Sequence, residues 1–103
     1  MRVLFDTCVP RPLRQSLPGH DVKTAQEMGW DQLRNGGLIQ MAEEGFDALI
    51  SSDQKLKHPQ NLTGRLSIIV LPTNHLRSVL ELAPKIALAL SEISSGVLVE
   101  IRS

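Results

Sequence analysis

Short apolar runs that end in polar turns recur along this chain, and they constrain its fold more than any other feature. The segments Arg2–Asp6 and Phe46–Asp53 have the same form, consecutive apolar residues followed by a polar position that carries an aspartate. Consecutive apolar residues are typical of strands buried on both faces, as in a parallel sheet. Ser67–Leu71 is a third and clearer run of this kind. We therefore predict a sheet built mainly from buried parallel strands.

Helical patterns lie between these strands. Val9–Leu17 has prolines suited to a first helical turn and apolar residues at helical spacing, which predicts a short helix. A second helix is expected from Leu38 to Gly45, with Asn35 as its cap. The apolar spacing of Leu76–Ser94 predicts a third helix, in which Pro84 either introduces a kink or starts a separate helix.

The other segments give weaker signals. Asp21–Thr24 is predicted as an inner or edge strand, and Ala25–Gly29 as a single helical turn before a polar loop that reaches residue 37. Gln54–Arg65 is predicted as a long irregular connection, which in small domains is often functional. Gly96–Ile101 is predicted as a last strand at the edge of the sheet.

Strands that alternate with helices predict one α/β domain over residues 1–103, a three-layer sandwich with a central, mostly parallel sheet and helices on both faces. The composition, 42% hydrophobic and 21% charged, is that of a globular protein. Eleven basic and eleven acidic residues cancel, so any contact with nucleic acid must be local. A single cysteine and the absence of a long apolar segment lead us to expect a cytoplasmic protein without a membrane span.

Asp6 and Asp53 are the candidate active centre. Ligands of parallel sheets bind at the carboxyl ends of the strands, and both aspartates follow predicted strands. Two neighbouring carboxylates repel each other unless a cation lies between them, and Mg²⁺ or Mn²⁺ prefers such oxygen ligands. The arrangement suits metal-assisted hydrolysis of a phosphodiester. The structural alternative is that Asp6 caps the next helix and Asp53 stabilises a turn.

Positive and amide side chains come directly after Asp53, and they are candidates for guiding a phosphate backbone to the site. They are Lys55, Lys57, His58, Gln60 and Asn61. Arg11, on the first predicted helix, is a further candidate for the same role. The alternative for all of them is a solvated surface.

A series of short motifs also resembles a known family. In chain order they are Leu4-Phe5-Asp6 with Val9-Pro10 and Leu13, Gly19-His20-Asp21-Val22, Gly29-Trp30, Asn35-Gly36-Gly37-Leu38, Glu44-Gly45-Phe46-Asp47-Ala48-Leu49-Ile50-Ser51-Ser52-Asp53, and Gln60-Asn61-Leu62. Their order and spacing resemble the short bacterial PIN-like domains regarded as toxin-related nucleases, and the resemblance covers nearly the whole chain.

The resemblance implies an RNA-cleaving enzyme that uses Mg²⁺ or Mn²⁺, the toxin half of a toxin–antitoxin pair. Its implied partners are an RNA substrate, a cognate antitoxin protein and a second copy of the chain in a homodimer. Asp6 matches the first acid of the family, Asp53 the acid of its Ser/Thr-x-Asp motif, and Ser51 the hydroxyl of that motif. Asn35 stands where many relatives have an acid, so we expect it to serve as a weaker, neutral ligand.

Two alternatives depend on departures from these patterns. Family members often read Asp-Glu-Asn-Leu-Pro at the first motif, whereas Thr7 follows Asp6 here, and this loss of an acid favours a catalytically inactive module that binds a partner protein or RNA. A receiver-like domain would also use strand-end aspartates to hold Mg²⁺. It needs a later strand-end lysine, which Val70-Leu71-Pro72 does not supply.

Overall fold

Five parallel strands form the centre of the molecule. The computed structural model describes all residues, 1–103. The strands are β1 (Arg2–Phe5), β2 (Asp21–Thr24), β3 (Ala48–Ser51), β4 (Ser67–Val70) and β5 (Leu98–Glu100). They lie in the order β2-β1-β3-β4-β5, and every neighbouring pair is parallel. The predicted α/β class is confirmed, and the sheet is wholly rather than mostly parallel.

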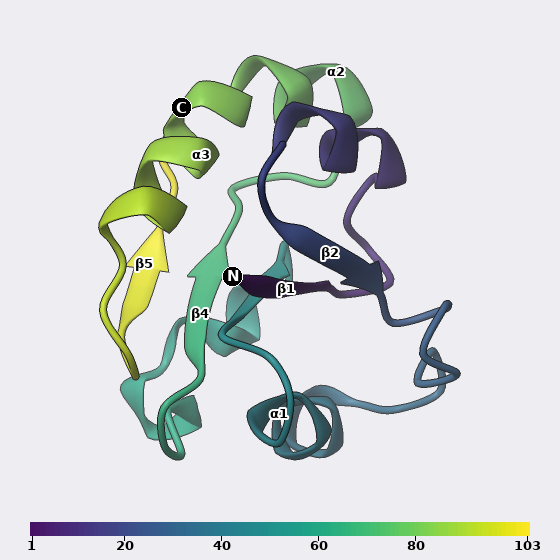
Figure 1. The fold of residues 1–103 in the computed structure, drawn as a ribbon, viewed down its shortest axis with the longest axis vertical. Coiled ribbons are helices and arrows are strands. Elements are labelled where there is room, and N and C mark those ends of the chain that lie inside the picture. The colour runs from purple at the N-terminus through teal and green to yellow at the C-terminus, as the bar shows by residue number, and fades with distance from the viewer.

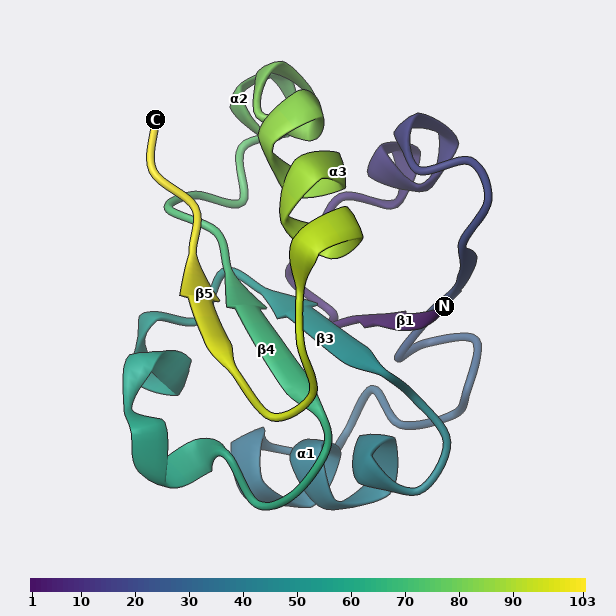
Figure 2. The same cartoon turned by 60° about the vertical axis from the view of Figure 1, so that its left-hand side comes forward.

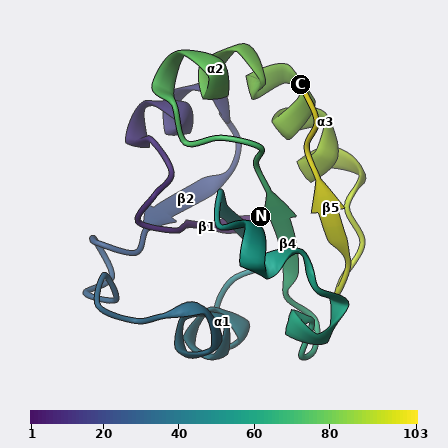
Figure 3. The same ribbon diagram turned by 180° about the vertical axis from the view of Figure 1, so that it is seen from behind.

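Helices cover both faces of this sheet. One face carries α1 (Asn35–Glu43), and the other carries α2 (Leu76–Glu81) and α3 (Ala83–Glu92), as Figures 1 and 2 show. Three short 3₁₀ helices complete the layers: η1 (Arg11–Ser16), η2 (Gln54–Lys57) and η3 (Pro59–Asn61). Seen from behind in Figure 3, η2 and η3 lie in the teal segment beside β4. The molecule is therefore a three-layer sandwich.

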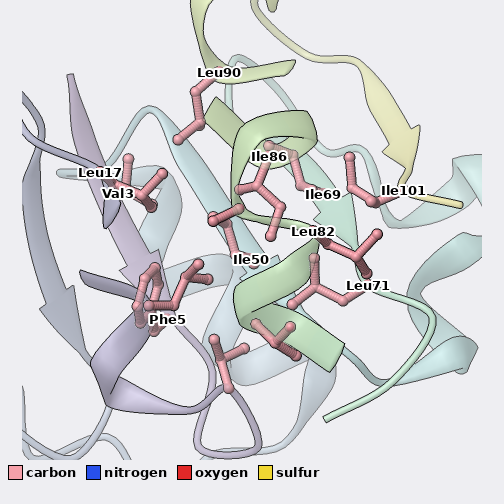
Figure 4. Packing of buried hydrophobic residues seen from close by; sticks show 14 of the residues in the cluster. Val3, Phe5, Leu17, Ile50, Ile69, Leu71, Leu82, Ile86, Leu90 and Ile101 are labelled. Carbon is pink, nitrogen blue, oxygen red and sulfur yellow. The ribbon is translucent and has the colours of Figure 1, made fainter. Parts of the chain in front are cut away.

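Alternate strand residues point into two separate cores. Val3, Phe5 and Ile50 pack toward α3 and η1 in the cluster drawn in Figure 4. Leu4 and Leu49 point to the opposite face and pack with the apolar side of α1. These five side chains are fully buried, and burial of a large apolar side chain contributes about 1.5–3 kcal/mol. Two-sided burial is the reason that the strands read as unbroken apolar runs.

One connection has the opposite hand to its neighbours. The chain moves in one direction across the sheet from β2 to β3, β4 and β5. The β2–β3 and β3–β4 connections pass over the face of α1, whereas α2 and α3 carry the β4–β5 connection over the other face. Right-handed crossovers are the general rule for parallel strands of one sheet, and β4–β5 departs from that rule. Without α2 and α3, that face would be covered only by η1 and its neighbouring residues.

The predicted elements exist with shifted boundaries. Instead of one helix over residues 76–94 there are two, Leu76–Glu81 and Ala83–Glu92, which meet at Leu82. Pro84 lies in the first turn of the second, which confirms the alternative of a separate helix. The assignment of Asn35 as a helix cap is wrong, because α1 begins at Asn35, and Arg34 occupies the N-cap position without a side-chain hydrogen bond. Gln54–Arg65 is less irregular than predicted, since it contains η2 and η3.

None of the helices has both the length and the apolar character needed to cross a membrane. The longest, α3, has ten residues.

Candidate functional site

The candidate site lies where the order of the strands reverses. The chain goes from β1 to β2 on one side and then returns to place β3 on the other side of β1. Such a switch point leaves a crevice at the carboxyl ends of the two central strands, because their connections leave over opposite faces. Asp6 follows β1 directly, and Asp53 lies two residues after β3. The topology therefore brings both aspartates to this crevice.

A pocket of about 550 Å³ occupies this position. Its lining includes four of the predicted site residues, Asp6, Asn35, Asp53 and Lys55. Two positive side chains, Arg34 and Lys55, line the same pocket. The volume lies within the range of about 300–1,000 Å³ that is usual for small-molecule sites. The sequence thus located the acids and Lys55, while Arg34 was missed although it immediately precedes Asn35.

Ser51 connects the two aspartates beneath the pocket. It is the last residue of β3 and is fully buried. Its Oγ donates to Asp6 Oδ2 at 2.7 Å and accepts the N–H of Asp53 at 3.0 Å. One hydroxyl therefore holds both the Asp6 side chain and the Asp53 backbone. Ser51 does not line the pocket itself but supports the residues that do.

Each aspartate also makes a local hydrogen bond. Asp6 Oδ1 accepts the N–H of Thr7 at 2.7 Å, and the N–H of Asp6 donates to the Ile50 carbonyl at 2.9 Å. Asp53 Oδ1 accepts the N–H of Lys55 at 2.9 Å and so caps η2. The turn role considered for Asp53 is thus realised, whereas Asp6 does not cap the next helix, because Pro10 occupies the N-cap position of η1. Both aspartates still line the pocket.

The cysteine next to this centre is a supporting residue. The Cys8 thiol is half-buried, packs against the larger core and accepts the N–H of Ser52 at 3.4 Å. Its sulfur lies 3.7 Å from Ser51 Oγ.

The other predicted substrate-binding residues are spread over several surfaces. Arg11 lies beside Arg14 in a separate hollow on η1, and Lys57 pairs with Glu100 at 3.3 Å. His58 is exposed at the start of η3. Gln60 and Asn61 line a second pocket, described below. Lys55 is therefore the only one of the six that lines the pocket of the two aspartates.

Two acids from the segment after β2, Glu27 and Asp31, do not line this pocket. Glu27 lies at the start of the turn after β2, where Thr24 and Glu27 bond each other's backbone N–H groups in a capping box. Arg14 donates two further hydrogen bonds to Glu27, the shorter of them 2.6 Å. These bonds, that of the Arg14 side chain foremost, lower the pKa of Glu27 to about 2. Asp31 is exposed and does not line the pocket.

The donor set suits one hard cation and not a cluster of cations. No group of three or more acidic, histidine or cysteine side chains is arranged to hold a metal ion. Mg²⁺, however, is commonly bound by one or two carboxylates together with waters and substrate phosphates. Asp6 and Asp53, with the amide of Asn35 in the same pocket, meet that smaller requirement. A cation at such a site would bind weakly until a phosphate supplied further oxygen ligands.

Comparison with protein-family models, with curated proteins and with solved structures gives no match to this chain. The PIN-like family indicated by the motifs stays a prediction.

Proposed function

We propose that this protein is a Mg²⁺- or Mn²⁺-dependent endoribonuclease whose active site is the pocket of Asp6 and Asp53. The observation that carries the proposal is the shared pocket at the switch point, which is lined by two aspartates and two basic residues. Acids that hold a cation next to basic groups that attract a phosphate are a combination suited to metal-assisted hydrolysis of a phosphodiester. The resemblance of the motifs to PIN-like nucleases supports RNA as the substrate.

The residues have separate roles in this proposal. Asp6 and Asp53 hold the cation, and Ser51 keeps Asp6 in place through its 2.7 Å hydrogen bond. Arg34 and Lys55 attract the scissile phosphate and offset part of its negative charge. A bound divalent cation activates a water molecule and neutralises the charge that develops on the phosphate. Asn35 contributes an amide oxygen at the edge of the pocket.

Cleavage of a labelled, unstructured single-stranded RNA tests the proposal. Wild-type protein should cut the RNA with Mn²⁺ or Mg²⁺ and stop when a chelator is added. Asp6→Asn should reduce the rate by about a hundredfold or more, because several kcal/mol of charge stabilisation are lost. Asp31→Asn is the matched control, since it makes the same chemical change at an exposed residue outside the pocket. Equal cleavage by wild type and Asp6→Asn would refute the assignment of the site.

The toxin role is a further part of the proposal. It requires a partner protein that blocks the pocket and thereby protects cellular RNA. Expression of the wild-type chain should arrest growth in a bacterial host, and Asp6→Asn should not. Growth that is equally unaffected by both proteins would argue against a toxin.

A catalytically inactive module that binds a partner protein or RNA is the second candidate. The absence of a third acid and the local hydrogen bonds of Asp6 and Asp53 favour it. It predicts RNA or partner binding that is unchanged by chelator and no cleavage under any metal condition. The RNA assay above therefore separates the two candidates.

A further inference from the structure

A second pocket adjoins the candidate active site. It has a volume of about 540 Å³ and lies between α1 and the segment that contains η3. Gly36 lines both this pocket and the pocket of Asp6 and Asp53, so the two hollows meet at the first turn of α1. A ligand held in one pocket can therefore extend across Gly36 into the other.

The two pockets differ in charge. Arg34 and Lys55 line the pocket of the aspartates, whereas the second pocket is lined by Glu43 and Glu44 and by no lysine or arginine. The carboxylate of Glu43 already makes hydrogen bonds within the protein, because it accepts the N–H groups of Arg65 and Leu66 at 2.6 and 3.1 Å. Glu44 is exposed. A phosphate is repelled from this second pocket, and an uncharged group that can donate hydrogen bonds is favoured there.

Carboxamide side chains supply the remaining polar groups of the second pocket. Gln40 and Gln60 are exposed on opposite sides of it, from α1 and η3. Asn61 donates to the Lys55 carbonyl at 3.3 Å, which leaves its amide oxygen to accept. Carboxamides offer a donor and an acceptor side by side, the pairing that reads the edges of nucleobases. Single-stranded RNA presents those edges unpaired.

We infer that the second pocket holds the nucleobase next to the scissile phosphate. The inference rests on the proposed ribonuclease function and specifies its substrate as single-stranded RNA. The bound base carries an exocyclic amino group that donates to Glu44. Its ring edge forms hydrogen bonds with Gln40 or Gln60. A basic side chain of a partner protein would also suit an acidic pocket. Continuity with the phosphate pocket at Gly36 favours the base, because a nucleotide carries both groups.

Gly36 and Gly37 provide a matched pair of variants. A Cβ at Gly36 would have no heavy atom within 4 Å, so a side chain there would project into open space where the pockets meet. A Cβ at Gly37 would touch Leu33 at 3.8 Å, an ordinary contact, and Gly37 lines neither pocket. Neither glycine has a positive φ. Gly36→Leu should therefore obstruct the passage, while Gly37→Leu makes the same change in α1 without doing so.

The test measures both binding and cleavage of a short single-stranded RNA and of versions that lack the base on either side of the cut. Binding is followed by fluorescence anisotropy with Ca²⁺ and cleavage with Mn²⁺. For wild type and Gly37→Leu, removal of one flanking base should weaken binding and slow cleavage by about tenfold, the effect of losing one good base contact. Gly36→Leu should show a similar loss on intact RNA and no further loss when that base is removed.

The outcomes separate this inference from the proposed function. Cleavage by wild type that ignores both flanking bases would overturn the base pocket and leave the ribonuclease intact. Base-dependent binding that is lost in Gly36→Leu, without any cleavage, would support the base pocket and overturn the enzyme. Absence of RNA binding, or binding to which neither flanking base contributes, would contradict the inference.

Discussion

Substitutions at Asp53 distinguish most clearly between a cation ligand and a residue that only stabilises a turn. Its Oδ1 accepts the N–H of Lys55 at 2.9 Å, so it caps η2 whether or not it binds metal. Asparagine caps helices about as well as aspartate, so Asp53→Asn keeps this hydrogen bond and removes the charge. Without metal we expect Asp53→Asn to be as stable as wild type within about 0.5 kcal/mol, or more stable. Asp53→Ala, which also loses the cap, should cost about 1 kcal/mol.

Added cation should reverse the ranking. At a Mg²⁺ concentration ten times its Kd, binding to the folded state alone stabilises wild type by RT ln 11, about 1.4 kcal/mol. For a domain of this size that corresponds to a rise in Tm of roughly 6–11 °C. Asp53→Asn should show little of this rise because half of the carboxylate pair is gone. Thermal melts of wild type and both variants measure the stability without metal when chelator is present, and the stabilisation by the cation when Mg²⁺ or Mn²⁺ is added.

A particular pattern would refute this reasoning. If Asp53→Asn melts well below wild type in chelator, the charge of Asp53 is needed for the fold and not for a cation. If the Tm of wild type is also indifferent to Mg²⁺ and Mn²⁺, Asp53 is a turn residue and the inactive binding module becomes the better candidate.

Three further predictions concern the scaffold and are checked by thermal or acid denaturation. Glu43→Gln should cost about 1–2 kcal/mol, because the charged acceptor of two backbone N–H groups, one of them from the buried Leu66, is replaced by a neutral one. The pKa of Glu27, lowered to about 2 from 4.5 chiefly by its hydrogen bond from Arg14, adds stability above pH 4.5 that is lost as the pH falls through about 2. Glu27→Gln should flatten this part of the pH profile. Gly96→Ala should destabilise by more than about 1 kcal/mol, since φ is +67° and the new Cβ would lie 2.6 Å from the Gly64 carbonyl oxygen. Wild-type stability of Glu43→Gln or Gly96→Ala, or an unchanged pH profile of Glu27→Gln, would contradict the corresponding prediction.

Local sequence predicted the elements of the fold better than their arrangement. Runs such as Ser67–Leu71 were recognisable because burial on both faces makes residues 68–71 consecutively apolar. The order of the strands and the opposite hand of the β4–β5 connection depend on contacts between distant segments, such as those of η1 with α2 and α3. The start of α1 was misplaced because Gly36 and Gly37 are poor helix formers. Burial of Leu38 and Ile39 holds that first turn in place.

The site was predictable to the same extent. Asp6 and Asp53 were found because a strand end is a local feature, and the parallel sheet then determines where strand ends meet. The position of Arg34 in the pocket and the anchoring role of Glu43 depend on how α1 packs, which the sequence does not specify locally. Arg11 and Lys57 were assigned to the substrate from charge alone. The structure places them in other surface hollows.

The position of Mn²⁺ in crystals of the wild-type protein tests the central claim most directly, because anomalous scattering identifies the ion and its ligands without a substrate. We predict an anomalous peak in the pocket at the switch point, coordinated by carboxylate oxygens from both Asp6 and Asp53. The peak should be lost in Asp6→Asn crystals of the same form. Ordered Mn²⁺ elsewhere on the protein, with none between these two carboxylates, would contradict the claim.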